Sequence, residues 1–233
     1  MLRVSAMRTS AGRLTRTLAK NKSRVIRYAF FMKLPAGDTQ LVQIMDQALA
    51  EAAHKAGSWL TCHAGCTQCC HGSFAVNTLD ALRLRTGMEA LRTTDPLRAK
   101  AVEERAQSWL SEHGDEFPGD HATGLLGQSE QDQERFADFA NEAACPALDP
   151  TTGHCDLYAW RPMTCRVFGP PVQMEEGIAC CELCFVDASE EQIAACAMPL
   201  PHELEAVLLD EVGATGETVV AFALVGQACF SKS

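Results

Sequence analysis

The sequence has 233 residues, of which 47% are hydrophobic, 21% are charged and only 6% are aromatic. This length suits one domain with a sizeable core, and the composition is that of a globular protein that favours helix. The net charge of −10 argues against a nucleic-acid partner, because binding to phosphates depends on cationic side chains. The sequence contains no apolar run of the length that a membrane-spanning helix requires, so no such helix is expected.

Residues 1–37 form a basic extension with nine Lys or Arg residues and neither Asp nor Glu. Three interpretations stay open: a mitochondrial targeting peptide, a disordered stretch upstream of a true start at Met32, or a basic arm. We expect 38–233 to be a single domain. No secretory signal is recognisable, so a cytoplasmic protein is expected, or a mitochondrial one if the extension is a transit peptide in a eukaryote.

The first predicted element is an amphipathic helix over 41–60. Its inward face carries Leu41, Ile44, Met45, Ala48, Leu49, Ala52, Ala56 and Trp59. A second helix is predicted after the N-cap Asn77, with Asp80 at the capping-box position. A third begins at Pro96, directly after Asp95, and its apolar side consists of Val102, Ala106, Trp109 and Leu110.

The second half of the chain alternates between loops and helices. Residues 113–127 are rich in Gly and Asp and predict a loop. Residues 128–144 predict a helix with an inward face of Phe136, Phe139, Ala140 and Ala143. The five prolines and two glycines of 145–171 exclude one regular helix. Helical patterns return between 189 and 229.

Cysteine is the most informative residue type, with 12 copies. Four lie in the stretch CHAGCTQCC: Cys62, Cys66, Cys69 and Cys70. Three more follow at ten-residue intervals in the proline-rich segment: Cys145, Cys155 and Cys165. A chain with ample core residues and no secretion signal does not need disulfides, so clustered thiols predict a metal centre. The first cluster lies on one helical face if the preceding helix continues, or in a tight loop if Gly65 and Gly72 break it.

Taken together, these motifs resemble the YkgJ-type CxxCxxCC cysteine-cluster family, which is described as a zinc- or iron-chelating domain. The resemblance covers about 60–171 and rests on C-x3-C-x2-C-C, C-P-A-L, C-D-L-Y-A-W and R-P-M-T-C-R. The usual family pattern has two residues, not three, between the first two cysteines. The resemblance implies that the metal ligands are Cys62, Cys66, Cys69, Cys70, Cys145, Cys155 and Cys165. Some longer relatives are flagellin lysine methylases, in which the motif is linked to an iron–sulfur cluster.

We favour an iron–sulfur cluster over zinc. Four thiolates complete a cubane cluster and leave three spare, whereas seven are too many for one closed zinc site and one too few for two. A zinc site could recruit a histidine from His63, His71 or His154. The C-x3-C-x2-C spacing alone is also that of radical-SAM enzymes. Their alternating strands and helices are not predicted here, and Gln68 stands where an aromatic residue is usual.

The roles of other residues near the motif are open to more than one interpretation. Arg161 and Arg166 flank Cys165, where they would contact the cofactor and stabilise its negative charge, or pair with acidic residues. The aromatic side chains are expected to pack around the site: Tyr158 and Trp160. A later C-C-x2-C group either adds ligands, forms a second site or contains ordinary thiols: Cys180, Cys181 and Cys184. Two further cysteines are expected to be small core residues: Cys196 and Cys229.

The expected fold is mainly α, an irregular helical domain organised around a cysteine-rich metal centre. Three functional classes stay open. An iron–sulfur oxidoreductase or methyl-transfer enzyme predicts a pocket beside the cysteines. A zinc-stabilised interaction module predicts a closed site and unfolding on chelation. A metal carrier predicts exchangeable binding by exposed thiols. No catalytic residue or substrate is identifiable from the sequence.

Overall fold

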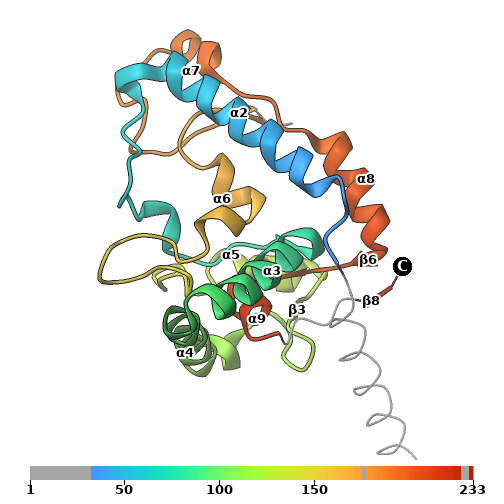
Figure 1. Ribbon diagram of the computed structural model, residues 1–233. Helices are drawn as coiled ribbons and strands as arrows, with labels where there is room; N and C mark the ends of the chain where they lie inside the picture. The colour runs from blue at the N-terminus through green and yellow to red at the C-terminus, as the bar shows by residue number, and fades with distance from the viewer. Residues whose placement is uncertain (1–32, 175–176, 227–230, 233) are drawn as a thin grey trace, which may run out of the picture.

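A computed structural model gives the architecture of the protein and describes residues 33–174, 177–226 and 231–232 (Figure 1). The helices are α2 (Asp38–Ala56), α3 (Thr78–Thr94), α4 (Pro96–His113), α5 (Glu130–Ala137), α6 (Met163–Val167), α7 (Glu190–Cys196), α8 (His202–Val212) and α9 (Val220–Leu224). Short 3-10 turns occupy Gly57–Trp59, Gln68–Cys70, Gly114–Glu116 and Tyr158–Trp160.

The strands are short and pair in antiparallel twos. The pairs are β1 (Val76–Asn77) with β7 (Glu217–Thr218), β2 (Gly119–Asp120) with β3 (Leu125–Leu126), β4 (Val172–Met174) with β5 (Gly177–Ala179), and β6 (Ala214–Thr215) with β8 (Ser231–Lys232). These pairs join loops rather than form a layer, and the protein is mainly α, as predicted. Across the described helices, none is both long and apolar enough to cross a membrane.

The larger apolar core lies where α3, α4 and α9 meet (Figure 1). Val102 and Ala106 of α4 are fully buried, which confirms the apolar side predicted for this helix. The ring of Phe117 lies 4.7 Å from that of Phe222 and 5.8 Å from that of Phe139, centroid to centroid. Aromatic pairs at these separations add to the stability that apolar burial already provides.

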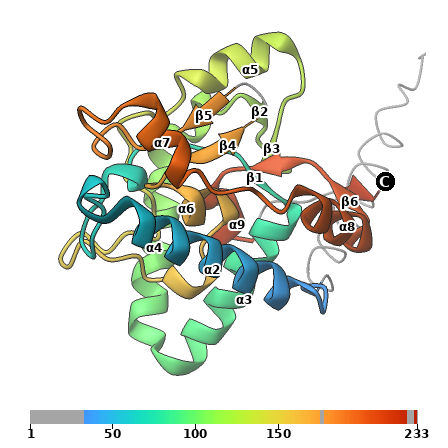
Figure 2. The same ribbon diagram turned by 90° about the horizontal axis from the view of Figure 1, so that it is seen from above.

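A second core lies under α2, which packs on α6 and α8. Its buried members from these helices are Leu41, Met45, Ala52, Met163 and Leu208. Seen from above, α2 crosses α6, with α8 near its first turn and α7 near its last (Figure 2). A smaller third cluster, around Cys184 and Cys196, packs against the last turn of α2. Cys196 is therefore a core residue, as predicted.

The predicted helix starts are confirmed. The side chain of Asn77 accepts a hydrogen bond from the Asp80 backbone N–H at 2.9 Å, which satisfies one of the free donors at the start of α3. Asp95 caps α4 in the same way through the Arg98 N–H at 3.1 Å, with Pro96 in the first turn. Asp80 does not complete a capping box, because its side chain is buried against Arg83.

Three predictions about the elements need correction. Ile44 was expected to face inward but is 41% exposed, since it lies at the margin of the stripe of Leu41 and Met45. The helix predicted over 128–144 ends at Ala137, and Ala140 has a φ of 53°, which a helix does not permit. The loop at 113–127 contains the small hairpin β2–β3. The prediction for Cys229 lies outside the described residues.

Candidate metal centre

Six of the seven predicted ligands lie on two segments, one that follows α2 and one that precedes α6, on the same side of the molecule (Figure 1). The seventh, Cys165, lies within α6. The first cysteine segment is a loop rather than a continuation of the helix. Gly65 and Gly72 have φ values of 90° and 87°, which L-residues with a Cβ rarely adopt. Of the two arrangements that the sequence allowed, the structure therefore has the tight loop.

Backbone hydrogen bonds join the two segments directly at the cysteines. The N–H of Cys145 donates to the carbonyl of Cys70 at 2.7 Å, and the N–H of Gly72 donates to Ala143 at 2.9 Å. A turn then brings Cys155 back beside Cys145, because the Asp156 N–H donates to the carbonyl of Ala147 at 2.8 Å. Thiols about 75 residues apart in sequence thus become neighbours.

A cavity of about 600 Å³ lies between these segments and α2. All seven predicted ligands line it, together with both predicted arginines. Two of the histidines considered as ligands, His63 and His154, also line it. In the part of the chain that the structure describes, no three His, Cys, Asp or Glu side chains are gathered tightly enough to hold a metal ion. The thiols surround a shared space rather than a single point.

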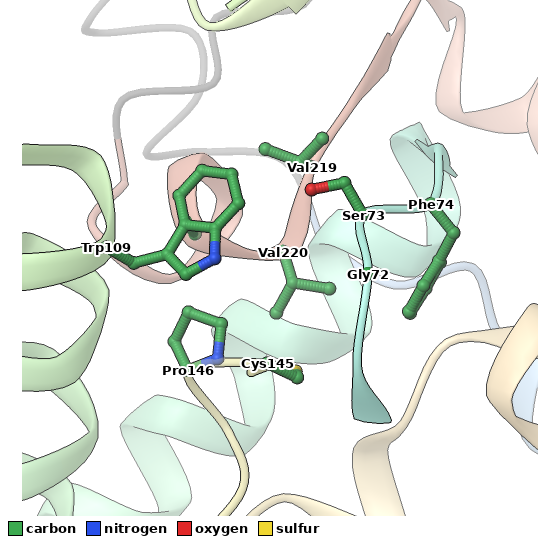
Figure 3. Close-up of a pocket in the computed structure, with 9 residues that line it drawn as sticks. Gly72, Ser73, Phe74, Trp109, Cys145, Pro146, Val219 and Val220 are labelled. Carbon is green, nitrogen blue, oxygen red and sulfur yellow. The ribbon is translucent and has the colours of Figure 1, made fainter. Parts of the chain in front are cut away.

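Cys145 packs against the main apolar core. Figure 3 shows Trp109, Pro146 and Val220 around a second, very small cavity of about 10 Å³ next to Cys145. The hydroxyl of Ser73 lies at the same cavity and has no hydrogen-bond partner among the described residues. This volume approaches that of one water molecule, and the packing leaves Cys145 little freedom to move.

Helix α4 fixes the positions of two thiol-bearing turns through Arg105. Its guanidinium donates to the carbonyl of Pro146 at 2.9 Å and to the carboxylate of Asp156. Arg98 binds the same carboxylate, which is almost fully buried. Pro146 and Asp156 directly follow Cys145 and Cys155. One helix therefore fixes the positions of both thiol-bearing turns relative to each other.

Arg161 and Arg166 line the cavity, and both pair with an acidic residue, which was one of the two expectations stated for them. Arg166 is 2% exposed and donates to Asp46 and to the carbonyl of Ala159, both at 2.6 Å. Arg161 lies 3.6 Å from Asp46, and its guanidinium stacks 4.0 Å from the centre of the Tyr158 ring. They share one carboxylate, which is half exposed, so positive charge remains at the cavity wall.

Five of the thiols influence one another and form what we call the inner set: Cys69, Cys70, Cys145, Cys155 and Cys165. A hydrogen bond from Cys70 lowers the pKa of Cys69 to about 6, and the charge of Arg161 acts in the same direction. Burial raises the pKa of Cys145 to about 12 and raises that of Cys165 well above its usual value. These buried thiols become thiolates readily only when a cation compensates their charge.

Four other thiols form what we call the outer set: Cys62, Cys66, Cys181 and Cys184. The sulfur atoms of Cys62 and Cys184 are 3.7 Å apart. Burial raises the pKa of Cys62 to about 12, and the neighbouring thiols of Cys184, Cys181 and Cys66 add to the rise. The eleven described cysteines are all free thiols.

The sequence alone did not separate these two sets, since the seven predicted ligands were treated as one group. It also gave no partner for Arg105 and Arg166, because their acceptors lie 51 and 120 residues away in sequence. After residue 171, the only pattern in the sequence that indicates further metal ligands is the spacing C-C-x2-C.

The comparison with protein-family models gives one match that includes the cysteines of both the inner and the outer set. Residues 61–185 match the CxxCxxCC family, described as "Putative zinc- or iron-chelating domain". The match covers more than half of the chain and extends past Cys184, further than the motif at 60–171. The chain is a metal-binding protein of the CxxCxxCC family. No curated protein and no solved structure matches it.

Proposed function

We propose that the inner set holds an iron–sulfur cluster. The observation that carries this proposal is the cavity of about 600 Å³, which thiols from three separate segments and two guanidinium groups line together. A cubane cluster needs four thiolates around a volume larger than one metal ion, and the inner set offers five. The cluster would supply electron-transfer or Lewis-acid chemistry when bound.

The chain's own residues favour a negatively charged centre at this position. Arg161 and Arg166 line the cavity, and their shared partner Asp46 neutralises only one of the two charges. Positive charge near thiolates stabilises them and raises the reduction potential of a cluster. Structural zinc also closes with four ligands, so the number of inner thiols fits either metal centre, and the size of the cavity is what favours a cluster over a single zinc ion.

Of the three functional classes, a redox or group-transfer enzyme best fits a cavity of this size beside the thiols. An interaction module would need only a closed site, and a carrier would present its thiols at the surface. Cys145 and Cys165 lie deep in the wall, where burial raises the pKa of both. We place the protein in a reducing compartment such as the cytoplasm, because clustered thiols serve as metal ligands only where they are kept reduced.

Anaerobic purification with iron, zinc and acid-labile sulfide analysis tests the proposal. We expect brown protein that contains iron and sulfide, and loss of both in Cys165→Ala. Cys196→Ala is the control, since Cys196 is a buried thiol that lies outside the cavity and should leave the iron content unchanged. Colourless protein that contains zinc and no sulfide would exclude the cluster.

A further inference from the structure

The outer set has the composition and spacing of a separate metal site. Cys62 and Cys66 form a C-x3-C pair, and Cys181 and Cys184 form a C-x2-C pair. Two such pairs, each on a short loop, are the usual source of the four ligands of a structural zinc ion. We propose that the outer set binds one zinc ion, independently of any metal in the inner set.

The separation of the two sets supports two centres rather than one. Cys62 and Cys66 line the main cavity at its edge, whereas Cys181 and Cys184 do not line it. Cys184 is 3% exposed and packs instead in the third apolar cluster, beside Ala56 and Phe185. The thiols nearest to Cys62 are thus outside the inner centre.

The distance between the paired sulfurs fits tetrahedral zinc. Zinc–sulfur bonds of about 2.3 Å in a tetrahedron place neighbouring sulfurs about 3.8 Å apart. The sulfurs of Cys62 and Cys184 are already 3.7 Å apart. They contribute one edge of the tetrahedron, one sulfur from each loop, and zinc would draw Cys66 and Cys181 in to complete it.

Hydrogen bonds align the two loops around this edge. The N–H of Phe185 donates to the carbonyl of Trp59 at 2.9 Å, and the hydroxyl of Thr61 donates to the carbonyl of Leu183 at 2.8 Å. Within the second loop, the N–H of Cys184 donates to the carbonyl of Cys181 at 2.9 Å, which closes a tight turn between the two ligands. None of these hydrogen bonds uses a thiol of the outer set, so they align the loops independently of the metal ligands and reduce the ordering that zinc binding requires.

Gly169 packs directly against the proposed site from the segment after α6. A Cβ at this position would lie 3.0 Å from the sulfur of Cys62, and its φ of 117° excludes most other residues. Its carbonyl accepts a hydrogen bond from the Cys181 N–H at 3.3 Å. Zinc in the outer set would therefore join three segments at the edge of the inner cavity.

The experiment compares metal content in anaerobically purified variants. We expect about one zinc per chain in the natural protein and at least a tenfold loss of zinc in the double variant Cys181→Ala/Cys184→Ala, with iron and sulfide unchanged. Cys180→Ala is the matched control from the same loop, because its thiol is exposed and outside the set. Cys165→Ala should retain zinc while it loses iron. Unchanged zinc in the double variant would overturn the inference, even if the cluster proposal holds.

A second measurement on the natural protein avoids any folding defect of the variants. Metal-free protein is labelled with a maleimide with and without added zinc, and each cysteine is read by peptide mass spectrometry. Zinc should slow labelling of the four outer cysteines at least tenfold and leave Cys180 unchanged. Equal rates with and without zinc, or a disulfide between Cys62 and Cys184 in protein alkylated anaerobically, would refute a zinc site.

Discussion

Single residues determine how α2 and α3 are held together. Arg83 is 1% exposed and binds two carboxylates, Asp38 of α2 at 2.6 Å and Asp80 of α3. Burial raises the pKa of Asp80 to about 6 even with this guanidinium beside it. Asp80 also accepts a hydrogen bond from the Met163 N–H at 2.8 Å. The buried carboxylate that pairs with Arg83 therefore also contacts the first turn of α6.

We predict that Arg83→Met destabilises the protein by about 3–5 kcal/mol, because two buried carboxylates lose their counter-charge. The free energy of unfolding is measured by chemical denaturation. Arg92→Met is the control, since Arg92 pairs with Glu103 at the surface and its loss should cost about 1 kcal/mol or less. Equal effects of the two substitutions would contradict the structural role of Arg83.

At the scale of elements, α4 acts as the support of the inner set. It contributes no thiol, but Arg105 binds the residues that follow Cys145 and Cys155. Apart from Cys165, which is on α6, the proposed ligands are on loops and short turns, whose positions depend on such contacts with rigid helices. A residue that orients ligands in this way affects metal binding without touching the metal.

We predict that Arg105→Met weakens iron binding about 10–100-fold, as is typical when a contact that orients metal ligands is lost. The reason is that the turns at Pro146 and Asp156 lose their shared donor. Retention of iron during titration with a chelator measures the effect. Lys100→Met, in an exposed pair on the same helix, should behave like the natural protein. A loss of helical circular dichroism in Arg105→Met would indicate a folding defect instead.

For the whole molecule, metal and apolar burial stabilise different regions. The two larger cores lie between helices and contain none of the inner-set thiols as fully buried members, whereas the cysteine segments lie on one side between α2 and α4. Metal binding links segments that are far apart in sequence, and that free energy contributes to folding. The helices should therefore survive metal removal better than the loops.

We predict that anaerobic chelation lowers the melting temperature by about 10 °C, which corresponds to about 4 kcal/mol of binding free energy in a protein of this size. Most of the helical circular dichroism at low temperature should remain. Melting curves with and without chelator measure this, and Cys165→Ala should show a smaller shift. Identical melting temperatures would mean that metal does not stabilise the fold.

Local sequence signals predicted much of the secondary structure. The predicted cap Asn77 and the predicted first-turn residue Pro96 identified the starts of α3 and α4 correctly, because such signals depend on residues only a few positions apart. The helix over 128–144 was predicted too long. The chain leaves the helix at Ala137, before the buried Phe139 and the positive φ of Ala140, so tertiary packing overrides helix propensity here.

The sequence by itself determined that this protein is mainly α and that it is a metal-binding protein of the CxxCxxCC family, because thiol spacing and helical periodicity are local properties of the chain. Only the tertiary structure decided which residues lie together. Cys62 lies beside Cys184, and Arg166 lies beside Asp46, 122 and 120 residues apart. Such contacts depend on how the helices pack, and no local pattern in a single sequence encodes them.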